Sequence, residues 1–598
     1  MIAAAGAGAT GQAAQAAPQC AKPARLVRLH PPGWRAPTYL DPSDNANYLA
    51  IGSRADLGLF ETGGSTTKTR RNSFAISEAA EMAAAYIVSG DPHALFWTPV
   101  PLGGVAAHTA VDIHTLAGST MSGRDASVAK DLASDRVIVG LAGDSADSNT
   151  LAWKWTLTVV GGTLTAVAAD IHPAAAYANG PSVAYAIDEG SPAYVVGIAP
   201  YPCTGFAGPT RGFRELEDAS GSILLAPPTG ALNSYAFAID YHIGGAKAEV
   251  LPINGPCGSG TQTTGCEAPA DEDSAAWSVA STSTSPPAVY SAFGGDPDVD
   301  TEIRGILADE RAVGLAFTGA YPNCASTAVY WDSSSTAPLD LGALEGDDES
   351  RAEAIQAVEA EVCGAIVGVR RPAGPDRVAG LWCGSGSTWQ TMEIDDVVRW
   401  DSDPHALSGG TPVGCDLPSD LDGPYGRWTI EELHDINSYG QMIGTMLVET
   451  RSSPQDPVVT VREAIAITSR EDVNSDFRVN AVDTAIVLGA WGTSWHVADV
   501  NGDGDVDGSD LAIVSGVWTG TAPCRVYLCT CEENESFTSG GAMSLDAAMS
   551  AALATLGFSD ADAFAAWAAE ASYTEVLAAC DGLAVLMQTL MENGGGSQ

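Results

Sequence analysis

Two segments near the C-terminal end carry oxygen-bearing side chains at the spacing of a calcium-binding loop. The first begins at Asp472, and a copy begins 27 residues later at Asp499. Calcium takes 6–8 oxygen ligands, which a twelve-residue loop supplies from alternating positions and from its last residue. The predicted metal-site residues are Asp472, Asn474, Asp476, Arg478, Asn480 and Asp483 in the first loop and Asp499, Asn501, Asp503, Asp505, Asp507 and Asp510 in the second. We therefore expect two Ca²⁺ ions here; a pair of solvated acidic loops without metal is the alternative.

The two loops differ in ways that predict unequal affinities. Position 6 of such a loop turns sharply and normally requires glycine. The second loop has Gly504 there, whereas the first has Phe477. A non-glycine residue at positive φ costs roughly 1–2 kcal/mol. The second loop also carries more carboxylates, since Asp505 and Asp507 stand where the first loop has Arg and Asn. We therefore expect the second site to bind calcium more tightly.

The duplication continues beyond the loops into a predicted helix. Residues 485–491 (Ala-Ile-Val-Leu-Gly-Ala-Trp) reappear as residues 512–518 (Ala-Ile-Val-Ser-Gly-Val-Trp). Duplicated Asp-x-Asn-x-Asp loops that end in Asp, each followed by one helix, resemble the repeats of type I dockerins. The resemblance covers about residues 472–520.

This resemblance implies a protein partner of the cohesin type, and so a scaffold or cell surface to which the chain attaches. In dockerins, positions 10 and 11 of each loop help to face the partner. Here they are Ala481-Val482 and Gly508-Ser509, which depart from the usual hydroxyl pair. The identity of the partner therefore stays open, with self-association or an intramolecular contact of the two helices as alternatives.

The composition of the 598-residue chain excludes several classes of partner and fold. It has 74 acidic against 28 basic residues, a net charge of −46, which disfavours nucleic acids and anionic lipid surfaces. With 45% hydrophobic residues and 14 tryptophans, the chain is not disordered. No apolar stretch of about 18 residues predicts a membrane span. The length exceeds that of one ordinary domain.

A diffuse repeat occupies the large region before the loops. Short apolar strands that end in Gly, such as residues 137–140 (Val-Ile-Val-Gly) and 365–368 (Ala-Ile-Val-Gly), are followed by a strand that contains Trp. Residues 93–97 (His-Ala-Leu-Phe-Trp), 340–342 (Asp-Leu-Gly) and 435–437 (Asp-Ile-Asn) resemble the extracellular HAF repeat, over about residues 72–467. Strands recurring about every 60 residues predict a mainly β fold, a β-propeller of about seven blades. A pair of β-sandwiches is the alternative.

No sequence motif identifies a catalytic site. Residues 6–11 fit G-x-G-x-x-G, but no strand precedes them and no βαβ unit follows. Residues 143–145 (Gly-Asp-Ser) lack a partner histidine in a recognisable motif, and neither H-E-x-x-H nor G-x-S-x-G occurs. We interpret His93 as part of the blade packing. The sequence therefore favours a protein that is not an enzyme, and an enzyme is the alternative.

The chain divides into four predicted parts. Residues 1–44 are a leader and entry segment, 45–470 the repeat propeller, 471–521 the dockerin-like calcium module, and 522–598 a helical tail that contains cysteines. The Ala14-Gln15-Ala16 triplet fits the end of an export signal, so we expect an extracellular or cell-surface protein.

The 12 cysteines are scattered, as expected for disulfides in an exported protein. Cys257 with Cys266 and Cys363 with Cys383 are plausible pairs. The four tail cysteines are also expected to form disulfides rather than a zinc site; they are Cys524, Cys529, Cys531 and Cys580.

Three functions follow from these observations. The leading hypothesis is a secreted calcium-binding protein whose dockerin-like module docks a non-catalytic propeller onto a cohesin-type partner. The second is a polysaccharide-degrading enzyme with its site in the propeller channel, because dockerins accompany polysaccharide breakdown. The third is a structural surface protein that calcium stiffens.

Overall fold

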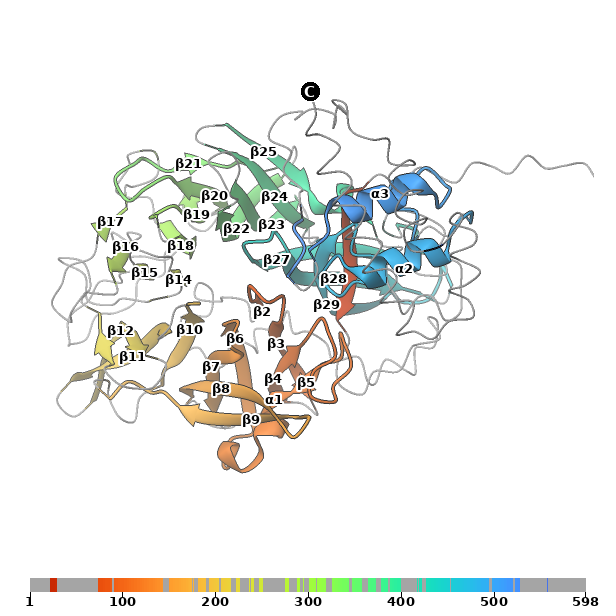
Figure 1. The fold of residues 1–598 in the computed structure, drawn as a ribbon. Coiled ribbons are helices and arrows are strands. Elements are labelled where there is room, and N and C mark those ends of the chain that lie inside the picture. The colour runs from red at the N-terminus through yellow and green to blue at the C-terminus, as the bar shows by residue number, and fades with distance from the viewer. Residues whose placement is uncertain are drawn as a thin grey trace, which may run out of the picture.

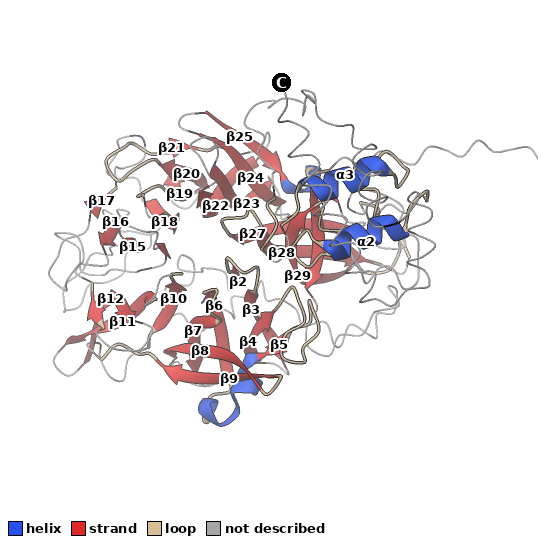
Figure 2. Cartoon of the chain, viewed as in Figure 1, coloured by secondary structure: helices blue, strands red, loops and turns tan. Residues whose placement is uncertain are grey.

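The computed structural model describes residues 22–29 and 74–526 with internal gaps, together with Gly557; the longest gaps cover residues 226–235, 251–274, 279–287 and 400–416. The described residues form seven β-sheets around a common axis, with two short helices packed beside one of them (Figure 1). Figure 2 shows how strongly strands dominate the ring. The mainly β, propeller-like fold expected from the repeats is confirmed.

Six of the blades take four strands each in chain order. They are β2 (Phe74–Ile76), β3 (Met82–Val88), β4 (Asp91–Trp97) and β5 (Val111–Asp112); β6 (Ala126–Leu132), β7 (Val137–Gly143), β8 (Leu151–Val160) and β9 (Thr163–Asp170); β10 (Val183–Ile187), β11 (Tyr194–Cys203), β12 (Phe206–Leu216) and β13 (Ile223–Leu224); β14 (Ile239–Asp240), β15 (Lys247–Val250), β16 (Ala275–Ser278) and β17 (Ala288–Val289); β18 (Thr301–Ile306), β19 (Ala312–Thr318), β20 (Ala325–Trp331) and β21 (Leu339–Asp340); β22 (Asp347–Ala357), β23 (Gly364–Pro372), β24 (Val378–Ser385) and β25 (Thr388–Glu393). A short helix, α1 (Ile113–Ala117), follows β5.

The seventh blade joins the two ends of the propeller. Its strand order is β26 (Val398–Arg399), β1 (Ala24–Leu29), β29 (Val459–Ser469), β28 (Met442–Thr450) and β27 (Arg427–Ile436). β1 pairs antiparallel with β29 along its whole length and is buried throughout. Sequence analysis placed these residues in an entry segment outside the propeller. That boundary is wrong for β1, because its partner strand lies too far along the chain for any local pattern to reveal the pairing.

A β-bulge recurs on the innermost strands of five blades. In β6, β10, β18, β22 and β27 the pairing register shifts by one residue just before a buried aliphatic residue. The bulged residues are large and buried, and they are Lys130, Tyr185, Arg304, Glu353 and His434. A bulge re-aims its side chain, here toward the neighbouring blade.

Two contacts between blades illustrate this role. The Lys130 ammonium lies 5.6 Å from the centre of the Tyr185 ring, and the His434 ring stacks on Phe74 of β2 at 4.6 Å between centroids. The bulge also explains the recurring glycine of the second strand. This glycine does not end the strand as the sequence predicted, because β7 continues from Gly140 to Gly143 and β23 from Gly368 to Pro372. A Cβ atom on Gly140 would lie 2.0 Å from the Val128 carbonyl oxygen, so the bulged strand leaves no space for a side chain.

Candidate functional site

The calcium module consists of two loop–helix units, as the sequence predicts. Helix α2 (Ala481–Gly489) follows the first loop and α3 (Gly508–Gly516) follows the second (Figure 1). Each helix begins with a capping box formed by loop positions 9 and 12, Asn480 with Asp483 and Asp507 with Asp510. The ligand side chains are therefore held in place by the backbone N–H groups that open each helix.

The first loop brings three carboxylates together. Oxygen atoms of Asp472, Asp476 and Asp483 lie within 4.8 Å of one another, the only such acidic group in the described part of the chain. Asp472 is fully buried and accepts hydrogen bonds from the backbone N–H groups of Asp476 (2.9 Å) and Phe477 (2.7 Å). Hard oxygen donors at this separation fit Ca²⁺.

The carboxylates of the first loop repel one another in the absence of a cation. Burial, followed by the neighbouring charges of Asp483 and Asp476, raises the pKa of Asp472 well above its ordinary value. Burial and the Asp476 charge raise the pKa of Asp483 to about 7. A bound divalent cation would remove this repulsion, which supports the fit of the residues to calcium.

The second loop repeats the hydrogen-bond pattern in a more exposed setting. Asp499 accepts from the backbone N–H groups of Asp503 (3.1 Å) and Gly504 (2.8 Å). Asp503, Asp505 and Asp507 are exposed, whereas Asp476 and Asn480 of the first loop are partly buried. The hydrogen bonds to the first aspartate are thus nearly the same in both loops, whereas burial differs because the propeller lies beside the first loop.

The predicted left-handed turn at position 6 is confirmed in both loops. Phe477 has φ 65° and Gly504 has φ 100°. Sequence analysis missed the surroundings of Phe477, which is fully buried in a propeller core cluster with Val27, Phe74 and Ile443. Truncating a buried Phe costs about 3–5 kcal/mol, more than the roughly 1–2 kcal/mol of a strained φ. Burial therefore outweighs the strain.

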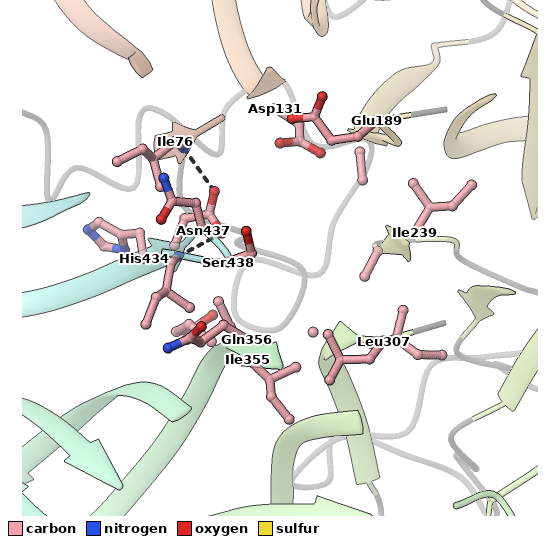
Figure 3. A pocket seen from close by; sticks show the side chains of 18 of the residues that line it. Ile76, Asp131, Glu189, Ile239, Leu307, Ile355, Gln356, His434, Asn437 and Ser438 are labelled. Atoms are coloured by element: carbon pink, nitrogen blue, oxygen red, sulfur yellow. Dashed lines mark hydrogen bonds between the residues drawn. The ribbon is translucent and has the colours of Figure 1, made fainter. Parts of the chain in front are cut away.

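A second candidate site is the cavity at the centre of the propeller. Its volume is about 540 Å³, and every inner strand contributes to its wall. One aliphatic residue per blade forms a ring around it, and these residues are Ile76, Leu132, Ile187, Ile239, Ile306, Ile355 and Ile436. Figure 3 shows side chains from several blades facing one another across the cavity.

Two aspartates in the cavity wall connect neighbouring blades. Asp435 accepts hydrogen bonds from the N–H groups of Ile436 and Ile76, both at 2.9 Å (Figure 3). Asp131 likewise accepts from Leu132 and Ile187, both at 2.9 Å. These carboxylates act as structural links between blades.

Two glutamates on the cavity rim are better placed for chemistry. Glu189 accepts from the Ser134 N–H (2.8 Å) and hydroxyl (2.9 Å) and from the Glu78 N–H (3.3 Å). Glu78 in turn accepts from the Ser438 N–H (3.0 Å) and hydroxyl. Burial, and to a lesser degree the Glu78 charge, raises the pKa of Glu189.

His93 on β4 belongs to a cluster with Asp112 on β5, His114 on α1 and Ser127 on β6 of the next blade. The Nδ1 atom of His93 lies 2.8 Å from Asp112, and that of His114 lies 2.9 Å from the Ser127 hydroxyl. The Ser127 oxygen also accepts from the Ala94 N–H (3.0 Å), which links two blades. The next blade repeats this arrangement around another Ser–His pair, so it belongs to the repeat architecture.

Of the cysteines in the predicted pairs and tail, the structure describes Cys383 and Cys524. Cys383 is disulfide-bonded, and Cys363 lies outside the described residues. Cys524 is a free buried thiol, which contradicts the expected tail disulfide at this position. Its sulfur lies 3.3 Å from the Thr468 hydroxyl. The other cysteines of the predicted pairs and tail lie outside the described residues, as do Asp144 and Ser145; they are Cys257, Cys266, Cys529, Cys531 and Cys580.

Replacing Phe477 by Gly should destabilise the protein although it relieves the strained backbone. We expect the free energy of unfolding to fall by about 1–4 kcal/mol, because the lost burial exceeds the relieved strain. Urea denaturation measures the difference. Phe477→Leu, which keeps most of the apolar volume, is the control and should lose less. A Gly variant as stable as the wild type would contradict the argument.

Calcium affinity should rise with pH through about 7. Raised pKa values mean that the folded calcium-free protein holds protons more tightly than the unfolded chain, so its stability falls as pH rises through this range. Calcium requires ionised ligands, and binding must therefore release protons at about pH 6 but few at about pH 8. Calorimetry in buffers of different ionisation enthalpy measures this release. Binding heats that do not depend on the buffer at the lower pH would refute it.

Among the helices of the described residues, none is long and apolar enough to cross a membrane.

Comparisons with known proteins identify the calcium module. Residues 470–516 match the family model of the dockerin type I domain. No curated protein matches the chain. Among solved structures, a GH62 hydrolase in complex with xylotriose is similar at 9% identity, with 46% of this chain and 87% of that chain covered and a TM-score of 0.20. A mutant Trypanosoma rangeli sialidase displaying trans-sialidase activity shares 11% identity over 50% of this chain and 56% of that chain, with a TM-score of 0.23. Scores this low carry no argument about fold or function. The family-model match, by contrast, shows that residues 470–516 form a type I dockerin domain.

Proposed function

We propose that this is an exported protein that docks by calcium onto a cohesin-type scaffold partner through its dockerin domain. The observation that carries the proposal is the duplicated loop–helix pair. Loop side chains cap both helices, and three carboxylates lie close together in the first loop. Both loops would bind calcium, the second more tightly, because glycine fills its position 6 and five carboxylates lie along it. An extracellular or cell-surface location follows from this role.

The two helices offer a docking face with equivalent halves. Ala485 and Ile486 on α2 are partly exposed, as are their copies Ala512 and Ile513 on α3. Aliphatic side chains left accessible at matching positions of two helices suit a protein partner. At position 11 of the loops, Val482 is partly exposed, so an apolar contact replaces the usual hydroxyl on that half.

The propeller would be the part that the dockerin presents. Under this proposal residues 1–44 contain the leader and β1, 45–470 complete the propeller, 471–521 form the calcium module, and 522–598 form the tail. The HAF-like repeats account for the blades but leave the ligand of the propeller open.

A second candidate function is hydrolysis of a polysaccharide in the central cavity. Glycosidases pair a carboxylic acid whose pKa is raised with an ionised carboxylate. Glu189 and Glu78 are adjacent on the rim, and the pKa of Glu189 is raised. Their hydrogen bonds go to neutral serine and backbone donors, and neither carboxylate forms an ion pair with another residue that the structure describes.

A glycan-hydrolysis screen of the full chain tests this alternative. Turnover that Glu189→Gln abolishes, while Asp309→Asn on the same cavity wall retains it, would establish the enzyme. Lack of turnover over a broad panel of plant and bacterial polysaccharides would leave docking as the function.

The docking proposal predicts two separable losses. Calorimetry should resolve two calcium sites of unequal affinity, and Asp499→Ala should remove the tighter one. Ile486→Asp combined with Ile513→Asp should keep both calcium sites, since neither side chain is a ligand, and yet abolish calcium-dependent capture on an immobilised cohesin-type domain. Capture that persists in EGTA, or that survives the double variant, would contradict docking through this face.

A further inference from the structure

We infer that calcium bound in the first loop stabilises closure of the propeller ring, in addition to shaping the docking module. The inference rests on the calcium site of the proposed function and concerns a different consequence of it. The first loop is built into the seventh blade through its side chains, whereas Asp503, Asp505 and Asp507 of the second loop are exposed. Four sets of contacts carry the argument.

The first calcium ligand is hydrogen-bonded to the strand pair that closes the ring. The hydroxyl of Thr468, near the end of β29, donates to the Asp472 carboxylate at 2.7 Å. Thr468 is fully buried and lies opposite Arg25 of β1 in the register of the pair. A shift of the Asp472 carboxylate would thus disturb a hydrogen bond to the β1–β29 pair.

Two buried arginines on β1 and β26 bind the backbone of the calcium module. Arg25 of β1 and Arg399 of β26 are neighbours in the sheet and are fully buried. The Arg25 guanidinium donates to the carbonyl oxygens of Arg470 and Val497 (2.8 Å for the latter), and Arg399 donates to that of Asp499 at 3.1 Å. These bonds reach the start of both loops from the strands that complete the blade.

The turn between β27 and β28 forms a third connection. Gln441 is fully buried, and its amide donates to the carbonyl oxygens of Phe477 (3.2 Å) and Cys524 (2.8 Å). The Val526 N–H donates to the Tyr439 carbonyl at 2.8 Å, so the chain leaving the module returns to the same turn.

The Phe477 side chain supplies the fourth connection. It occupies position 6 of the first loop and packs among core residues of β1, β2, β28 and β29. The loop that carries the predicted calcium ligands is therefore anchored by an apolar side chain in the core between the first and seventh blades.

These contacts make the first loop and the closing strands one cooperative unit. Without a cation, three carboxylates within 4.8 Å repel one another in a loop that is anchored to β1 and β29. A ligand that binds only the folded form stabilises whatever unfolds together with its site. Calcium in the first loop should therefore slow opening of β1 and β29, while calcium in the second loop should stabilise little beyond the module.

Hydrogen–deuterium exchange of the full chain with calcium or with EGTA tests this inference. We expect calcium to slow amide exchange in β1 and β29 by about tenfold or more in the wild type. Asp499→Ala should keep the effect and Asp472→Ala should lose it, since the two residues hold the same position in the two loops. Strands β8 and β9, away from the seventh blade, are the internal control.

A conservative variant separates the anchor from the calcium ligands. Thr468→Val removes the hydroxyl that contacts Asp472 but no ligand, so calcium should still bind while protection of β1 and β29 decreases. If Asp472→Ala does not fold, this variant and the wild-type comparison decide the question.

The outcomes distinguish this inference from the docking proposal. Calcium binding and partner capture with unchanged exchange in β1 and β29 would overturn only the inference. Protection confined to residues 472–519, or lost in Asp499→Ala but not in Asp472→Ala, would do the same. Failure of calcium to bind, measured by calorimetry on the same samples, would overturn both.

Discussion

The antiparallel pairing of β1 with β29 is the constraint on which the rest of the structure depends. It brings together the first and last strands of the propeller, from Ala24 opposite Ser469 to Leu29 opposite Ala464. Closing so long a loop costs chain entropy, and the contacts that offset this cost are concentrated at the closure. Arg25, Thr468 and Phe477 are all fully buried there. The dockerin domain begins immediately after β29, so the closure also fixes where the docking module lies.

Sequence reasoning captured the features that depend on local chemistry. The loop spacing, the helix that follows each loop and the left-handed backbone at Phe477 all follow from neighbouring residues, and each is observed. The strands and their recurring glycines were recognisable for the same reason, although these glycines lie inside the strands and not at their ends. What escaped prediction depends on distant partners. No local pattern marks Lys130 and His434, yet a register shift in each strand buries them in contact with a neighbouring blade.

The two calcium loops show how surroundings divide the roles of a duplicated motif. Their backbone hydrogen bonds are nearly the same, and both aspartates at position 12 cap a helix. The first loop is desolvated by the propeller and raises the pKa of its own carboxylates, whereas most acidic residues of the second face water. Sequence duplication therefore says little about functional equivalence once one copy is packed against a larger body.

The burial of Phe477 has a consequence for how this domain can be reused. Here an excised segment would carry an aromatic side chain at a turn that holds φ 65° with no core to receive it. The exposed ring would favour aggregation and would leave the strained turn without compensation. This dockerin depends on its propeller for the burial of Phe477, and a version that is transferred to another protein would need glycine at position 477.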